Sequence, residues 1–295
     1  MRTFAFTSML LIILYVSMAC SSDPDGIGTP PQAEGNLEPE TLVVALLPDE
    51  DPAEILRLHD GLKNFLQERL QRQVELVVHH DYGIMVEAMR SGHLHLAYFG
   101  PATYIVCKDA GTHIEPFAAK KRGGSTTYTG IIIANPDSGV RTISDIAGKT
   151  MAYGDPGSTS SHLIPKRMLL AENLRPRHDY NEVFLGSHDA VAMNVATGNV
   201  AAGGMSVGIY TRLVEQGSID PQHAVVIAES PSYPQYPWTM RSDLSPALQR
   251  AIRDAFLQLD DADILAAMQA DGFGPVSDQD YDIVRELEKT VADYR

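Results

Sequence analysis

Small residues and hydroxyl groups are concentrated in one segment of the chain, Gly154 to His162, with the sequence GDPGSTSSH. A β-strand is expected just before it at 150–153, and the apolar spacing of 163–174 predicts a helix after it. The segment therefore lies at a helix N-terminus, where unbonded N–H groups and the helix dipole favour a negatively charged or strongly polar oxygen ligand. Ser and Thr are also common as ordinary N-caps. The segment alone leaves both an anion-binding turn and a simple cap open.

Other reactive residues suggest weaker alternatives. Ser160, His188 and Asp189 suggest a serine hydrolase, but adjacent His and Asp side chains rarely align as a triad, and the chain has no G-x-S-x-G motif. The histidines lack a companion Cys or carboxylate cluster at metal-binding spacing, so we expect neither a metal site nor a cofactor. Cys107 lies within a predicted helix at 101–110 and is interpreted as a small buried hydrophobe. Its alternative is a ligand for a thiol-seeking element such as trivalent arsenic.

The N-terminal residues have the features of an export signal. Residues 1–19 carry one charge, Arg2, and an apolar run too short to span a membrane comfortably, followed by small residues. Cys20 at that point resembles the bacterial lipoprotein pattern, in which this cysteine is lipidated and anchors the protein to a membrane. Residues 20–39 are rich in Pro, Gly and acidic residues, which predicts a flexible tether.

The charge balance excludes some partners. The sequence has 23 basic and 38 acidic residues, a net charge of −15, which argues against a nucleic-acid surface and a polybasic membrane patch. Long-range attraction of anions is also disfavoured, so an anion site must act locally. If Cys20 is acylated, Cys107 is the only other thiol and no internal disulfide can form.

Strand and helix patterns alternate from residue 40 onward, which predicts an α/β fold with helices on both faces of each sheet. A second strand and helix series begins near residue 129, and a Pro-rich segment at 231–237 returns the chain to the first series. We expect lobe 1 to comprise 40–128 and 234–295, and lobe 2 to comprise 129–233. Two chain crossings predict a hinge around a central cleft, where the ligands of open α/β sheets bind.

Several motifs together resemble the periplasmic phosphonate-binding protein family, the solute receptors of ABC importers for phosphonate, phosphite and related oxyanions. They are DY at 81–82, LAYFGPATY at 96–104, GDPGSTS at 154–160, GSHDAV at 186–191 and GNV at 198–200. The resemblance implies a type II periplasmic binding fold with mainly parallel sheets. It also implies a monomeric, periplasmic, non-enzymatic protein that delivers its ligand to a membrane permease.

The resemblance also implies the residues of the site. Ser158, Thr159, Ser160 and His188 would hold the oxyanion, and Tyr82 would close over it from lobe 1. Hydroxyls and backbone amides are neutral donors that bind an oxyanion without the desolvation cost of a buried Arg or Lys. His188 can add a donor when it is protonated, or when its tautomer directs an N–H at the ligand.

Departures from the family pattern concern the choice of ligand. Phe99 replaces a tyrosine, Tyr236 replaces an aspartate, and 203–208 has no carboxylate to meet an ammonium group. We therefore expect phosphite, phosphate or a small phosphonate as the ligand, and not an aminoalkyl phosphonate. A related branch binds arsenite and signals to a membrane sensor kinase, which leaves that function, with Cys107 as the arsenic ligand, as the alternative.

Overall fold

The computed structural model describes residues 35–294, and the predicted signal segment and Cys20 lie outside the described residues. Residues 35–39, which fall in the predicted tether, include Leu37, whose N–H donates to the carbonyl of Asp243 at 2.9 Å. Leu37 also forms an isolated parallel bridge with Leu244. Within the described residues, no helix combines the length and apolar character needed to cross a membrane.

The first lobe is built on a six-stranded sheet in the order β13-β4-β12-β3-β1-β2. Its strands are β1 (Thr41–Leu46), β2 (Gln73–Val78), β3 (Leu96–Tyr98), β4 (Ile114–Lys120), β12 (Pro237–Arg241) and β13 (Phe273–Gly274). β1 pairs in parallel with β2 and β3, whereas β12 pairs antiparallel with β3 and β4. The sheet is mixed because β12 enters it from the opposite direction, after the chain has returned from the second lobe.

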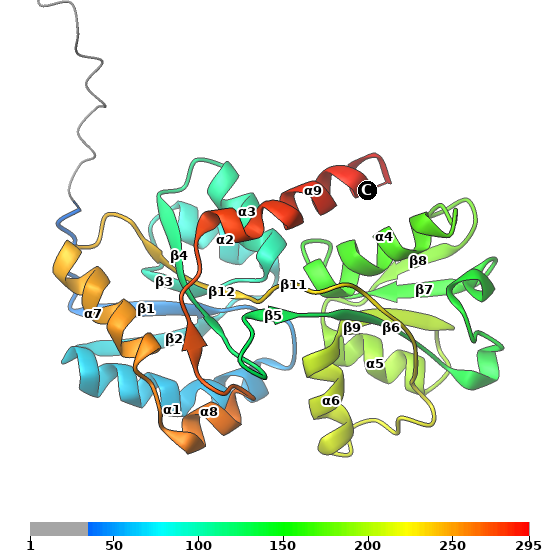
Figure 1. The fold of residues 1–295 in the computed structure, drawn as a ribbon, viewed down its shortest axis with the longest axis horizontal. Helices are drawn as coiled ribbons and strands as arrows, with labels where there is room; N and C mark the ends of the chain where they lie inside the picture. The colour runs from blue at the N-terminus through cyan, green and yellow to red at the C-terminus, as the bar shows by residue number, and fades with distance from the viewer. Residues whose placement is uncertain (1–34, 295) are drawn as a thin grey trace, which may run out of the picture. The chain divides into compact units, whose positions relative to one another are not determined.

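The second lobe is built on a five-stranded sheet in the order β10-β6-β9-β7-β8. Its strands are β6 (Gly130–Ala134), β7 (Thr150–Tyr153), β8 (Asn181–Phe184), β9 (Ala202–Ser206) and β10 (Val225–Glu229). β7 pairs in parallel with β8 and β9, while β6 lies antiparallel between β9 and β10. The chain crosses between the sheets twice, through β5 (Thr127–Tyr128) and β11 (Tyr233–Pro234), which pair with each other antiparallel (Figure 1).

Helices cover both sheets. Those of the first lobe are α1 (Pro52–Leu70), α2 (Tyr82–Arg90), α3 (Pro101–Asp109), α7 (Pro246–Leu257), α8 (Ala262–Ala267) and α9 (Asp282–Val291). Those of the second lobe are α4 (Ile164–Ala171), preceded by a π-helix at Thr159–Leu163, α5 (His188–Ala196) and α6 (Val207–Glu215). Short 3₁₀ turns lie at Pro136–Ser138, Ile143–Ile146, Asp278–Tyr281 and Ala292–Tyr294. The predicted two-lobed α/β fold is confirmed, but both sheets are mixed and not mainly parallel, and β4, β12, β13, α6 and α9 were not predicted.

Alternation along β6 explains why the second sheet is covered on both faces. Ile131 and Ile133 belong to an apolar cluster with residues of α5 and α6, whereas Ile132 and Ala134 belong to a cluster with residues of β7 and α4. Successive side chains of a strand point to opposite faces, so an uninterrupted apolar strand needs cover on both. A sheet buried in this way is a firm support for the loops at its ends.

Candidate functional site

The candidate residues gather at the carboxyl ends of parallel strands. In the first lobe, the loop after β1 carries Asp49, and α2 begins with Tyr82 just after β2. In the second lobe, the π-helix follows β7 and His188 begins α5 after β8. Parallel strands place their carboxyl ends on one edge of the sheet, which is where ligands of open α/β sheets bind.

Hydrogen bonds between the lobes show that these two edges face each other. The Ala102 N–H, at the start of α3, donates to Thr159 Oγ1 at 2.8 Å, and this bond is buried. The His188 N–H donates to the main-chain oxygen of Asp49 at 2.8 Å. The predicted site residues of the two lobes therefore meet in one buried interlobe region.

The turn after β7 has an unusual backbone. Its N–H groups bond five residues back, from Leu163 to the carbonyl of Ser158 at 3.1 Å and from Ile164 to the carbonyl of Thr159. Pro165 follows and has no N–H to donate, so a regular α-helical bond to Ser161 is impossible there. Single π-turns of this kind are frequent at functional sites.

The neighbouring serines of this turn have different roles. Ser161 Oγ accepts from the Gly154 N–H at 2.7 Å and donates to the Gly204 carbonyl at 2.5 Å, so its bonding is satisfied inside the lobe. Ser158 Oγ caps the turn by accepting from the Ser161 N–H at 3.1 Å. Thr159 Oγ1 accepts from Ala102, which leaves its own proton to donate. The capping interpretation is therefore confirmed for Ser158, and anion binding by the other hydroxyls stays a prediction.

Some buried polar atoms near the interlobe bonds have no hydrogen-bond partner within the described chain. Such atoms occur in several parts of residues 35–294, and four of them, from both lobes, are called the donor cluster: Tyr82 Oη, Tyr128 Oη, Ser160 Oγ and His188 Nε2. Ser160 is close enough to oppose the rise in the pKa of both Tyr128 and Tyr236. Burying a polar group without a partner costs free energy. A cluster of them converging from two lobes indicates a site for an oxygen-rich ligand.

The tautomer of His188 follows from its hydrogen bonds. Its Nδ1 accepts from the Ser206 N–H at 3.1 Å, so the neutral ring carries its proton on Nε2, the atom in the donor cluster. Burial lowers the pKa of His188 to about 3. His188 is therefore a neutral N–H donor at physiological pH, which is the second of the two states considered from the sequence.

The electrostatics around the donor cluster are unusual for an anion site. Burial raises the pKa of Tyr82 and Tyr128, so their hydroxyls remain neutral donors. A cavity of about 60 Å³ lies beside them and is lined by residues that include Asp49, Lys120, Arg212 and Tyr236. Burial raises the pKa of the Asp49 carboxyl to about 6, although Lys120 and Arg212 act in the opposite direction. Charged side chains thus line this cavity, and the four residues of the donor cluster lie outside its lining.

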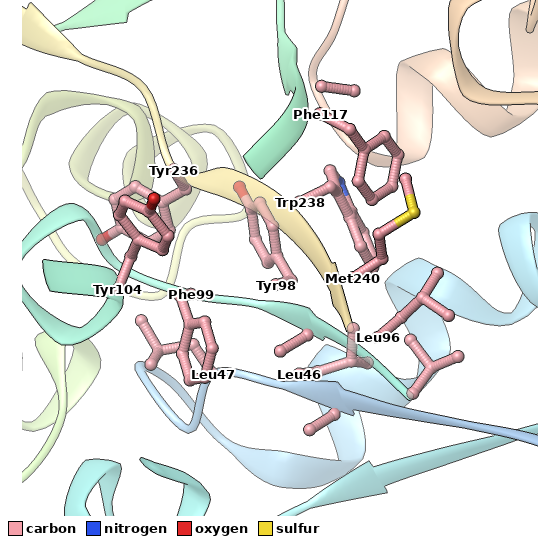
Figure 2. Packing of buried hydrophobic residues seen from close by; sticks show 14 of the residues in the cluster. Leu46, Leu47, Leu96, Tyr98, Phe99, Tyr104, Phe117, Tyr236, Trp238 and Met240 are labelled. Carbon is pink, nitrogen blue, oxygen red and sulfur yellow. The ribbon is translucent and has the colours of Figure 1, made fainter. Parts of the chain in front are cut away.

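The aromatic residues predicted at the site take different positions. Tyr236 lines the cavity, and its ring lies 5.5 Å from that of Tyr98. Figure 2 shows Tyr98 between Tyr236 and Trp238, with Phe99 apart from them beside Leu47. Phe99 is fully buried in the core of the first lobe. Consecutive residues of β3 point to opposite faces, so Tyr98 faces the cavity, and a contact between Phe99 and a ligand stays a prediction.

Cys107 lies in the apolar core of the first lobe. Its side chain is fully buried on α3, and burial raises the pKa of its thiol. A raised pKa keeps the thiol protonated and weakens it as a metal or metalloid ligand. The segment 234–238 is also buried, and Trp238 pairs with Tyr98 inside the sheet.

Two residues of the site were missed by sequence reasoning. Tyr128 lies in β5 on the first crossing between lobes, and its hydroxyl belongs to the donor cluster. Asp49 lies in the loop after β1, a position typical of ligand contacts in α/β sheets. The same expectation applies to every loop at the carboxyl edge of the sheet, so it did not distinguish Asp49 from the residues of the other loops.

The fold and the converging donors define a class of protein. Two α/β lobes joined by two crossings, with polar donors between them, form the type II periplasmic binding fold. A crystal structure of a phosphonate ABC transporter binding component from Pseudomonas aeruginosa superimposes with a TM-score of 0.78 at 24% identity, covering 84% of this chain and 85% of that one. The PhnD1 protein of Prochlorococcus marinus, solved with methylphosphonate, gives a TM-score of 0.80 at 18% identity, covering 86% and 99%.

Sequence comparison then gives the family. The family model described as "ABC transporter, phosphonate, periplasmic substrate-binding protein" matches residues 44–281, and the chain belongs to this family. The chain is 28% identical over 307 residues to the "Phosphate-import protein PhnD" of Mycolicibacterium smegmatis, covering 95% of this chain and 94% of the relative. It is therefore a periplasmic solute-binding component of an ABC transporter, and not an enzyme.

Proposed function

We propose that the protein captures a small phosphorus oxyanion, such as phosphite, phosphate or a simple phosphonate, between its lobes and delivers it to the permease of its ABC transporter. The donor cluster is the observation that carries this proposal. Its hydroxyls and imidazole N–H are neutral and buried, and they come from both lobes. Ser158 and Thr159 add further hydroxyl protons at the start of the π-helix.

Neutral donors suit a ligand that must be released. A buried Lys or Arg would have to be desolvated before it met the ligand, and the resulting ion pair would be costly to separate. Hydroxyls and N–H groups at helix N-termini hold an oxyanion through short directional bonds without a full opposite charge. The relatives are consistent with this chemistry, since one is named for phosphate import and one was solved with methylphosphonate.

Isothermal titration calorimetry of the purified protein against phosphite, phosphate, methylphosphonate and arsenite tests the proposal. We expect saturable heat with at least one phosphorus oxyanion and none with arsenite. Heat with arsenite alone, abolished in Cys107→Ser, would establish the arsenite receptor instead.

We also propose that Cys20 is lipidated and holds the protein at the membrane. The proposal is supported by the sequence around Cys20, with an apolar run and small residues before it and a Pro-rich acidic segment after it. Membrane fractionation of producing cells should recover the wild-type protein with membranes and Cys20→Ser in the soluble periplasmic fraction. Equal release of both proteins would refute the anchor.

A further inference from the structure

Two positively charged side chains of the first lobe line the cavity beside the donor cluster. Lys120 ends β4, and Arg122 follows it shortly before the chain crosses to the second lobe. Both are half-buried, and within residues 35–294 neither forms an ion pair. Lys120 Nζ donates to the Met268 carbonyl at 3.3 Å and lies 5.2 Å from the centre of the Tyr98 ring. Removing a cation from water without a carboxylate partner costs free energy, so this cavity favours an anionic guest.

The start of α6 brings further positive charge to the same place from the second lobe. The N-cap residue Ser206 makes no side-chain capping bond, and the first turn of the helix has no acidic residue. A Cβ at Gly208 would lie 2.6 Å from Arg122 Nη1, so the glycine leaves the space that the guanidinium occupies. A helix N-terminus carries a partial positive charge. Arg122 and the helix start therefore repel each other, and a bound anion would relieve that repulsion.

The carboxylates of the cavity lining offset these cations only in part. Glu50 is already paired with Arg212, and among the described lining residues Asp49 is the other carboxylate. Burial lowers the pKa of Lys120 to about 8, although Asp49 acts in the opposite direction, so Lys120 is mainly protonated at neutral pH. Burial lowers the pKa of His59 to about 4, so its ring is neutral. The lining therefore keeps an excess of positive charge.

The cavity shares two of its walls with the donor cluster. Ser206 lines the cavity, and its N–H donates to His188 Nδ1 at 3.1 Å. Tyr236 lines it as well, and its ring lies 5.3 Å from the ring of Tyr128. His188 and Tyr128 both belong to the donor cluster. A ligand held by that cluster can therefore extend a substituent into the cavity without leaving the interlobe region.

We propose that this cavity binds a second anionic group of the ligand, and that the substrate class is phosphonates bearing a carboxylate on a short carbon chain. The phosphonate end meets the neutral donor cluster, and the carboxylate meets Lys120, Arg122 and the start of α6. The cavity, at about 60 Å³, has room for a group of a few atoms. A planar carboxylate also matches the fork of a guanidinium. This inference rests on the proposed function and names the substituent that the site accepts.

The same charges disfavour other substituents. An ammonium group, as in an aminoalkyl phosphonate, meets Lys120 and Arg122 with charge of the same sign, which is unfavourable. An alkyl group removes water from both cations and gives them no partner in return. The cavity should therefore prefer a carboxylate to an alkyl group, and an alkyl group to an ammonium group.

Calorimetric titration with phosphonates of matched chain length tests this order. The probes are 3-phosphonopropionate, propylphosphonate and 2-aminoethylphosphonate, each at about pH 7. In the wild type we expect 3-phosphonopropionate to bind at least about tenfold more tightly than propylphosphonate, and 2-aminoethylphosphonate to bind at least about tenfold more weakly than propylphosphonate. Equal affinities for 3-phosphonopropionate and propylphosphonate would overturn the inference without the need for any variant.

Arg122→Gln tests the residue assignment. The preference for 3-phosphonopropionate over propylphosphonate should fall at least about fivefold, because one cation facing the carboxylate is lost. Lys121→Gln is the matched control, because it removes the same charge from the neighbouring residue, which does not line the cavity. It should leave the preference unchanged. If Arg122→Gln does not fold, Lys120→Gln should show the same loss, and a folded variant of either residue with the wild-type preference would overturn the inference.

Titration with methylphosphonate, phosphate and phosphite distinguishes this inference from the proposed function. A wild type that binds one of these ligands but shows no preference for a carboxylate refutes the inference and leaves the proposed function standing. A wild type that binds none of the phosphorus compounds, 3-phosphonopropionate included, would overturn the proposed function and this inference with it.

Discussion

Two adjacent serines show how closely binding and structural roles can lie in one turn. Ser160 Oγ belongs to the donor cluster, whereas Ser161 Oγ joins the Gly154 N–H to the Gly204 carbonyl. Both residues are fully buried, so exposure does not distinguish them. Only the partners of each hydroxyl separate the residue that holds the turn together from the one that faces the ligand.

Alanine substitutions should separate these roles. Ser160→Ala removes a donor to a charged ligand, so we expect ligand affinity to fall about 10- to 100-fold with unfolding free energy nearly unchanged. Ser161→Ala leaves two buried main-chain groups without a partner, so we expect the free energy of unfolding to fall by about 1–3 kcal/mol. Calorimetric titration and urea denaturation measure the two effects. Equal losses of affinity and stability in both variants would contradict the division.

Asp49 should also affect the stability of the ligand-free protein. Its pKa rises from 3.8 to about 6 on folding, so its charged form is less stable in the folded chain than in the unfolded chain. At about 1.4 kcal/mol per pKa unit, this lowers the free energy of unfolding by at most about 3 kcal/mol. This reduction is complete above about pH 6 and disappears as the pH falls below 3.8.

We therefore expect Asp49→Asn to be more stable than the wild type at about pH 8 and equally stable near about pH 4. Urea denaturation at both pH values, without ligand, measures the difference. A variant that is less stable than the wild type at about pH 8 would show that Lys120 and Arg212 outweigh the cost of burying the carboxylate.

At the scale of elements, the pairing of β3 with β12 connects the ligand space to the core. Trp238 of β12 stands opposite Tyr98 of β3, and their rings stack 4.8 Å apart. Tyr98 lines the cavity on one side, while Trp238 lies 4.8 Å from Phe256 of α7 on the other. Trp238 is therefore separated from the cavity by the Tyr98 ring alone (Figure 2).

Trp238 is the only tryptophan of the chain, so its fluorescence should report binding. We expect a saturable change in emission on adding ligand, with the same midpoint as the calorimetric titration. Trp238→Phe should abolish the optical signal while the heat of binding remains. No emission change at saturating ligand would indicate that Tyr98 does not move or change its surroundings on binding.

At the scale of the whole molecule, the interlobe contacts determine how readily the lobes close. The Arg212–Glu50 pair joins α6 to the loop after β1, with side chains only 13% and 9% exposed. The bond from Ala102 to Thr159 and the bond from His188 to Asp49 lie in the same buried region. These contacts involve residues next to the donor cluster, so closure and ligand capture are expected to be coupled.

Removing the Arg212 charge should weaken closure. Arg212→Gln leaves Glu50 buried without its partner, so we expect the ligand Kd to increase at least about tenfold. The ligand-induced decrease in radius of gyration, measured by small-angle X-ray scattering, should then require proportionally more ligand. Arg253→Gln is the control, because Arg253 pairs with Glu115 inside the first lobe at a partly exposed position. That variant should stay within about twofold of the wild type.

Much of the fold could be predicted from local patterns. The helix at 101–109 and the strand at 150–153 lie where the sequence predicted them, to within a residue. Short strands that depend on distant partners were harder to predict, as β12 shows. The sequence indicated only that a Pro-rich segment returns the chain to the first lobe, but β12 becomes a central strand because β3 and β4 bond to it on either side.

The sequence by itself determined the α/β alternation, the hydroxyl-rich turn at a helix start and the family motifs, because each depends on residues close together in the chain. Only the tertiary structure decided which hydroxyls are left without a partner between the lobes, which tautomer His188 adopts, and that Tyr128 and Asp49 lie in the same region. Those features arise where the ends of distant strands meet across two lobes. Burial and the loss of water at that meeting place determine the protonation of each group, and no local pattern encodes them.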